Sequence, residues 1–136
     1  MNITLIGSGN VATVLAKLSV QKGHNIRQII ARNLIDAEEL AREVGGEAGN
    51  ISDCIVLHTD LVIVALSDSS LPNALSRLDF REIPVVHSAG AVSINVLKEI
   101  ALNYGVLYPL QSLRKDMEKI PPIPFLMEAN NERTEK

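Results

Sequence analysis

The 136 residues of this chain, 46% of them hydrophobic and 21% charged, suffice for a single domain with a substantial core. A net charge of −3 and an aromatic content of 3% provide neither the basic surface nor the stacking side chains that bind nucleic acid. A single cysteine, Cys54, excludes an internal disulfide and indicates a reducing, cytoplasmic compartment, and no apolar run approaches the length of about 20 residues that spans a membrane.

The chain begins with a strand that leads into a glycine-rich turn. Residues 2–6 form an apolar run typical of a buried strand, and residues 7–12 (Gly-Ser-Gly-Asn-Val-Ala) follow at once. An amphipathic helix is predicted over residues 10–22, with Gly23 ending it. Strand, Gly-x-Gly-x-x-Ala and helix in this order are the context of a dinucleotide-binding fingerprint, and a plain strand-to-helix turn is the alternative.

Each position of the fingerprint has a physical role. Gly7 permits the tight turn out of the strand, and Gly9 lets a pyrophosphate approach the backbone because it has no Cβ. Ala12 is small enough for the helix to pack against the strand, and the first turn of the helix favours an anion. We therefore expect the pyrophosphate to be bound by Gly7, Ser8, Gly9, Asn10 and Val11.

The residue after the second strand, predicted over residues 25–31, indicates the type of dinucleotide. In such folds this position meets the adenosine ribose, where a carboxylate selects NAD and an arginine neutralises the 2′-phosphate of NADP. The chain has Arg32 there, so NADP is the expected cofactor. An exposed, solvated arginine is the alternative interpretation.

A second helix follows, capped by Asn33 with Asp36 three residues later, and stopped by the Gly45–Gly46 pair. Residues 47–57 are expected to hold a short third strand and a turn of helix. Further strands are predicted at residues 61–66, 84–87, 106–108 (broken at Pro109) and 125–128, with helices over 71–78 and after Ser93.

This alternation of strands and helices predicts an α/β fold: a doubly wound, mostly parallel, Rossmann-like sheet in a single domain over residues 1–129. Its ligand would lie at the carboxyl ends of the strands, where the backbone of Leu66 and Ser67 would line the cofactor. For the side chain of Ser67, an ordinary turn residue is the alternative.

Three polar residues at the ends of later strands are candidates for the reaction itself. His87 is the candidate general acid, with a strand-end histidine hydrogen-bonded to backbone as the alternative. Ser88 and Gln111 are candidates to hydrogen-bond a small-molecule substrate. Three widely spaced histidines without a cysteine partner give no metal-ligand pattern, so no metal is expected.

Several segments together resemble a known group of proteins: the Gly7-x-Gly9-x-x-Ala12 turn, Ala31-Arg32, the run 60–65, His87-Ser88-Ala89-Gly90 and Tyr108-Pro109-Leu110-Gln111. The chain looks like the N-terminal domain of bacterial Rossmann-like oxidoreductases whose second half is a helical domain of unknown function. It is more distantly similar to pyrroline-5-carboxylate reductase and to NADP-binding domains of the 6-phosphogluconate dehydrogenase type. It departs from the group at Ala89 and Ala91, where hydroxyl side chains are usual.

The resemblance implies a homodimer in which a C-terminal helical domain supplies dimer contacts and half of the cleft. The charged tail, residues 130–136, would be the start of that domain. The expected function is that of an NADP-binding domain of an oxidoreductase that transfers hydride between NADP(H) and a small polar carbonyl, imine or alcohol. The alternative is a non-catalytic dinucleotide-binding regulatory module, whereas a nucleotide-sugar or S-adenosylmethionine enzyme has no need of Arg32.

Overall fold

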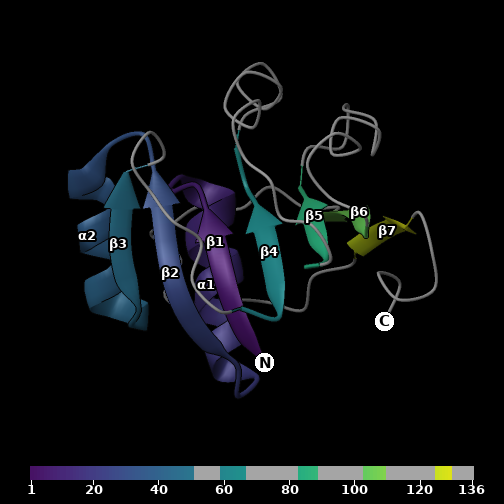
Figure 1. Cartoon of the computed structure of the whole chain (residues 1–136), viewed down its shortest axis with the longest axis horizontal. Helices are drawn as coiled ribbons and strands as arrows, with labels where there is room; N and C mark the ends of the chain where they lie inside the picture. Colours follow the sequence, from purple (N-terminus) through teal and green to yellow (C-terminus); the bar gives the residue numbers. More distant parts are fainter. Residues whose placement is uncertain (51–58, 67–82, 89–102, 110–124, 130–136) are drawn as a thin grey trace.

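The computed structural model describes residues 1–50, 59–66, 83–88, 103–109 and 125–129. The predicted helices over 71–78 and after Ser93, and the tail 130–136, lie outside this part of the chain. In chain order the elements are β1 (Asn2–Ile6), α1 (Asn10–Gln21), β2 (Asn25–Ala31), α2 (Leu34–Val44), β3 (Glu47–Asn50), β4 (Leu61–Val64), β5 (Val85–His87), β6 (Tyr104–Pro109) and β7 (Phe125–Ala129), as labelled in Figure 1.

The strands form one sheet in the order β3-β2-β1-β4-β5-β6-β7. Every neighbouring pair is parallel except β6 and β7, which are antiparallel. The chain moves outward from β1 to β2 and β3, and then returns to the other side of β1 to form β4. This order confirms the predicted Rossmann-like α/β fold and places its topological switch point between β1 and β4, where such sheets bind their ligands.

The first four elements have the bounds that their sequence signals predict, to within a residue. Helix α1 ends at Gln21, and the following Gly23 has a φ of +88°, a conformation that favours glycine. Helix α2 begins after Asn33, whose side chain accepts hydrogen bonds from two backbone N–H groups, and it ends before Gly45 at a φ of +89°. Local capping and stop signals therefore set these boundaries.

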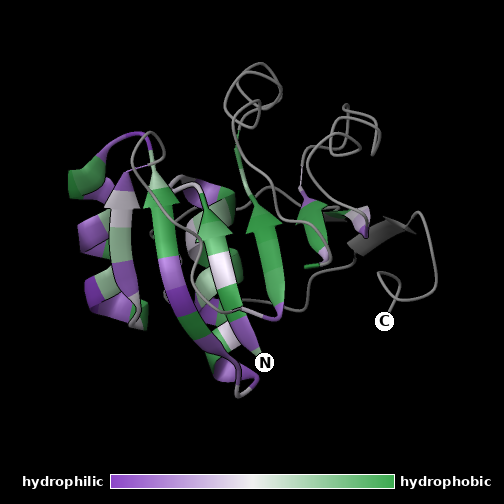
Figure 2. Cartoon of the chain, viewed as in Figure 1, coloured by the Kyte–Doolittle hydropathy of each residue, from purple (hydrophilic) through white to green (hydrophobic). Residues whose placement is uncertain are grey.

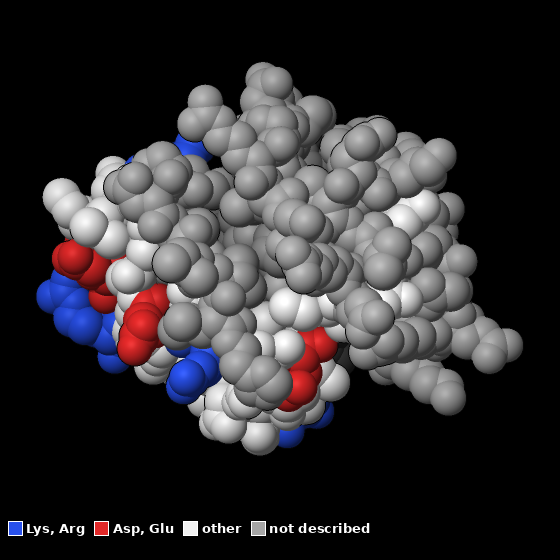
Figure 3. All heavy atoms as spheres, in the orientation of Figure 1, with Lys and Arg blue, Asp and Glu red and all other residues white. Residues whose placement is uncertain are grey.

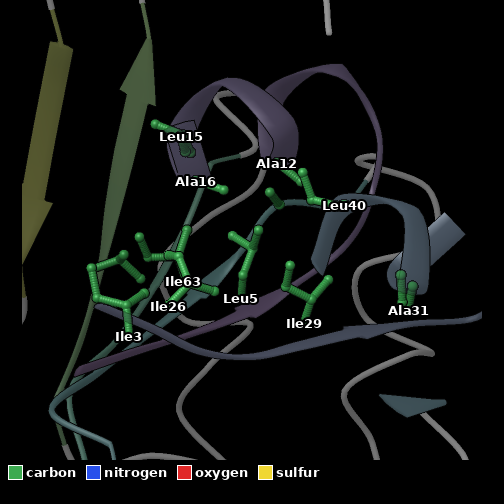
Figure 4. Close-up of a cluster of buried hydrophobic side chains, with 13 residues drawn as sticks. Ile3, Leu5, Ala12, Leu15, Ala16, Ile26, Ile29, Ala31, Leu40 and Ile63 are labelled. Carbon is green, nitrogen blue, oxygen red and sulfur yellow. The ribbon is translucent and has the colours of Figure 1, made fainter. Parts of the chain in front are cut away.

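Both described helices pack on the same face of the sheet (Figure 1). Figure 4 shows side chains of α1 and α2 facing those of the central strands across this layer. Figure 2 shows the division by hydropathy: β1 and β4 are mainly hydrophobic, whereas hydrophilic and hydrophobic residues alternate along α2. The buried cluster consists of Ile3, Leu5, Ala12, Leu15, Ala16, Ile26, Ile29, Ala31, Ala37, Leu40, Ile63, Ala65 and Val86.

The opposite face of the sheet is buried as well. Side chains alternate between the two faces along a strand, and paired residues of neighbouring strands share a face. Leu5 faces the helices, so its neighbour Ile6 and the residues in the same row, Val64 and His87, face the other way. All three are completely buried, with none of their surface exposed. Burial on both faces explains why these strands read as continuous apolar runs.

The sixth strand differs from its prediction. It was expected over residues 106–108 and broken at Pro109, but β6 begins at Tyr104 and includes Pro109. Gly105 pairs with Val86 on one side and with Ala129 on the other, so pairing on both edges outweighs the low strand propensity of glycine. Strand β4 stops at Val64, two residues short of the predicted run.

Candidate functional site

The carboxyl ends of the four central strands meet in one row at the same edge of the sheet. Ile6 pairs with Ile30 of β2 and with Val64 of β4, and Val64 pairs in turn with His87 of β5. The residues that follow continue the ladder, because three backbone N–H groups each donate to a carbonyl of the neighbouring strand: Gly7 to Ile30 (2.7 Å), Ala65 to Ile6 (2.8 Å) and Ser88 to Val64 (3.1 Å).

Gly7 stands at the switch point, and the fold itself requires a glycine there. Its φ is +126°, and a Cβ at this position would lie 2.3 Å from the carbonyl oxygen of Ala65. The same Cβ would lie 3.6 Å from the Cβ of Ala12, which is completely buried. A larger residue than alanine at position 12 would therefore separate α1 from the turn, as expected for the third position of the fingerprint.

Gly9 is required by neither strain nor packing. Its φ of −80° and ψ of −160° are open to any residue, and a Cβ built on it would meet no heavy atom within 4 Å. The residue is exposed and occupies the N-cap position of α1. Glycine here leaves open the space immediately in front of the helix, which is the space that a pyrophosphate would fill.

The beginning of α1 is suited to an anion. Gly9 provides no side-chain cap, and the first turn contains no acidic residue. The positive end of the helix dipole is therefore not neutralised by a carboxylate of the helix itself. Ser8 and Val11 flank this position and are each half-buried, while Asn10 is exposed.

Arg32 lies one strand away, directly after β2. Arg32 is exposed, and within the described ranges no ion pair includes its guanidinium. Its main chain is held, because the Asn50 side-chain Nδ2 donates to the Arg32 carbonyl at 3.1 Å. The described ion pair lies elsewhere, between Lys17 Nζ and Glu43 Oε2 at 3.3 Å. In Figure 3 basic and acidic side chains lie side by side at the α2 end of the molecule.

The residues proposed for the later part of the cleft are less accessible. Leu66 is half-buried, and Ser88 is buried with 8% of its surface exposed. His87 is completely buried on the face opposite to α1, which agrees with a strand-end histidine held inside the protein; its role as a general acid stays a prediction. Ser67 and Gln111 lie outside the described residues.

Two contributions at this edge were not foreseen from the sequence. The carbonyl of Ala65 fixes the identity of Gly7, and the side chain of Asn50 reaches the main chain of Arg32. An asparagine at the carboxyl end of the third strand, next to the second in this topology, was a signal that could have identified the latter contact.

Neither a metal centre nor a membrane-spanning helix is found among the residues that the structure describes. Among the residues that the structure describes, no group of three or more histidine, cysteine, aspartate or glutamate side chains could hold a metal ion. Neither α1 nor α2, with 12 and 11 residues, is long enough to cross a membrane.

Comparison with known proteins agrees with this geometry. The model of a family described as NADP oxidoreductase, coenzyme F420-dependent, matches residues 2–91, and NADP is the cofactor that Arg32 predicts. A search of curated protein sequences finds no match.

Solved structures match over most of the chain. A Bacteroides fragilis protein described as a candidate NADP oxidoreductase is 36% identical, with a TM-score of 0.82, and the match covers 98% of this chain and 53% of that one. A Thermotoga maritima protein is 19% identical (TM-score 0.73, covering 95% and 49%). The 1-pyrroline-5-carboxylate reductase of Streptococcus pyogenes is 23% identical (TM-score 0.63, covering 80% and 42%) and shares the fold. The chain therefore spans about half the length of these solved proteins.

Proposed function

We propose that this chain, which belongs to the family described as coenzyme F420-dependent NADP oxidoreductases, is the cofactor-binding part of an enzyme that transfers hydride between NADP(H) and a small polar carbonyl, imine or alcohol. The observation that carries the proposal is the pair of features at one edge of the sheet. Gly9 leaves space in front of a helix without a side-chain cap, and Arg32 presents an exposed positive charge directly after the neighbouring strand.

The chain's own residues bind and orient the cofactor. When bound, the nicotinamide ring supplies the hydride chemistry. The backbone of residues 7–11 would hold the pyrophosphate, and Arg32 would pair with the 2′-phosphate through its planar guanidinium. Leu66 and Ser67 would line the path from the pyrophosphate to the nicotinamide.

The substrate end of the site is a proposal that extends the same row of strand ends. Ser88 follows β5 beside the row, and we propose that Ser88 and Gln111 hydrogen-bond the polar group of the substrate. His87 is proposed as the proton donor, which would require the cleft to open to its imidazole on substrate binding. A relative of similar fold is a reductase of 1-pyrroline-5-carboxylate, which supports an imine among the candidate substrates.

The experiment is a binding and turnover assay. Titrations followed by the fluorescence of the reduced nicotinamide should show tighter binding of NADPH than of NADH, and equal affinities would contradict the role of Arg32. NADPH consumption is then followed with a panel of cyclic imines, keto acids, aldehydes and coenzyme F420, using this chain and a longer chain of the length of the Bacteroides fragilis relative. NADPH binding without turnover of any compound by either chain would favour the alternative, a non-catalytic dinucleotide-binding module.

We further propose that the protein is cytoplasmic and forms a homodimer, and that residues 1–129 are the dinucleotide-binding domain with 130–136 leading into a helical domain. The single cysteine supports a reducing compartment, and the resemblance to two-domain oxidoreductases supports the dimer. Light scattering of the longer chain measures its mass in solution, and a monomeric mass would contradict the dimer.

A further inference from the structure

The end of the β2–β3 ladder contains a side-chain contact that lies beyond the regular pairing. The parallel register of these two strands ends with Ala31 opposite Asn50. The next carbonyl along the chain, directly after β2, belongs to Arg32, and the Asn50 side chain donates to it through Nδ2 at 3.1 Å. The amide of Asn50 thus extends the pairing of the two strands by one hydrogen bond.

Side-chain hydrogen bonds also hold the chain on the other side of Arg32. The Asn33 side chain accepts hydrogen bonds from the N–H groups of Ile35 (2.9 Å) and Asp36 (3.5 Å), which fixes the entry into α2. The main chain of Arg32 therefore lies between two anchors, while the residue itself is exposed to solvent.

Fixing the backbone of an exposed arginine changes how much it contributes to binding. A long side chain on a fixed backbone loses less conformational freedom on binding than one on a mobile loop, because fewer torsions remain to be ordered. The effect is specific to a ligand that the guanidinium touches, since the asparagine does not itself supply charge.

We propose that Asn50 is a positioning residue for the 2′-phosphate of NADP(H), acting through the main chain of Arg32. The proposal rests on the proposed function and names a determinant of its cofactor specificity. Through Asn50, strand β3 would contribute to the preference for NADP over NAD.

The test is the substitution Asn50→Ala, measured by titration of the nicotinamide fluorescence with NADPH and NADH and by isothermal titration calorimetry with the fragments 2′-AMP and 5′-AMP. We expect the dissociation constants of NADPH and 2′-AMP to rise about 3- to 10-fold, the loss typical of releasing one ordered side chain. Those of NADH and 5′-AMP should change less than twofold. Asn25→Ala is the matched control, because Asn25 is an exposed asparagine at the opposite end of β2 whose Nδ2 lies 3.4 Å from Asn2 Oδ1.

A cycle with Arg32→Ala separates positioning from a general structural role. In the Arg32→Ala background, Asn50→Ala should not raise the dissociation constant of NADPH any further. The proposal would be overturned if Asn50→Ala reduced the affinities for NADPH and NADH equally. It would also be overturned if Asn50→Ala reduced the NADPH affinity as much in the Arg32→Ala background as in the unmutated protein. If Asn50→Ala does not fold, as judged by thermal unfolding, Asn50→Ser takes its place, because serine at this position is too short to reach the same carbonyl.

Different results would contradict the proposed function and the positioning role of Asn50. If the unmutated protein does not distinguish NADPH from NADH, the function assigned to Arg32 is wrong. If it does and Arg32→Ala removes the distinction while Asn50→Ala does not reduce it, only the positioning role is wrong.

Discussion

Helices α1 and α2 start at the same edge of the sheet, each after a parallel strand, but their first turns differ. Asn33 caps α2 by accepting from two backbone N–H groups, and Asp36 places a carboxylate in the first turn. Gly9 stands at the equivalent position of α1, which has neither a side-chain cap nor an acidic residue in its first turn.

The difference has an energetic meaning. A side-chain cap is worth about 1 kcal/mol of stability, and a carboxylate in the first turn about 0.3–1 kcal/mol. Helix α2 uses both, whereas α1 uses neither, although Gly9 has backbone angles and space that would accept a capping residue. The stabilisation that α1 lacks within the chain is the one that a bound pyrophosphate would supply.

The largest effect is expected from Gly7→Ala, which tests the turn on which the start of α1 depends. The new Cβ would lie 2.3 Å from the Ala65 carbonyl oxygen in a backbone conformation of φ +126°. We expect a loss of stability of about 3 kcal/mol or more, measured by urea unfolding, from the combined clash and strain. A variant as stable as the parent would show that the β1–β4 switch point is less tightly packed than described.

Gly9→Val should remove nucleotide binding and leave the fold intact, because the added side chain occupies open space. We expect NADPH to bind at least about 100-fold more weakly, since a branched side chain occupies the position of the pyrophosphate. Circular dichroism should change little, and urea unfolding should show a loss of at most about 1 kcal/mol because valine is a poorer N-cap than glycine, which is less than the loss expected for Gly7→Ala. Unchanged binding by the folded variant would mean that the start of α1 is an ordinary strand-to-helix turn.

Arg32→Ala should weaken the binding of NADPH by about 1–3 kcal/mol, the range of a charge-assisted hydrogen bond, and should have little effect on the binding of NADH. Fluorescence titration of both cofactors measures the difference. Arg27→Ala is the control, because Arg27 is another exposed arginine of the same region, five residues earlier on β2. If both variants lose NADPH affinity equally, a general effect of net charge accounts for the result.

Asn33→Ala tests the capped member of the pair. Loss of the side-chain acceptor should cost about 1 kcal/mol of stability, seen as a lower urea midpoint with an unchanged slope. NADH binding should be retained, because the pyrophosphate site belongs to α1. A loss of NADH affinity as large as that of Gly9→Val would remove the distinction between the two helices.

Much of this arrangement was predictable, because its signals are local. Glycines at 7, 23 and 45 adopt positive φ angles where the sequence predicts turns, and Asn33 caps the helix that it precedes. The Gly9 position was predicted as a site of close approach, and the structure describes open space there. The fold class, a doubly wound and mostly parallel sheet, followed from the alternation of strands and helices.

The remaining features depend on pairing between distant segments, which no local pattern encodes. Strand β6 includes Gly105 because it pairs with both β5 and β7, and β7 runs antiparallel at the edge. The contact of Asn50 with Arg32 requires the register of β2 and β3. The complete burial of His87 depends on the face to which the last residue of β5 points.

The smallest expected effect is also the one that tests the comparison most directly: Gly9→Ser should give α1 the cap that α2 already has. The φ and ψ of Gly9 suit an N-cap, and a Cβ there meets nothing, so serine fits without strain. Its hydroxyl would accept from an N–H of the first turn, which should raise stability by a few tenths of a kcal/mol. The same hydrogen bond competes with the pyrophosphate, so NADPH and NADH should both bind several-fold more weakly. A gain in stability by urea unfolding together with a loss of cofactor affinity by fluorescence titration would show that a side-chain cap on α1 is incompatible with tight binding of its ligand. Gains in both would show that glycine at this position has no such role.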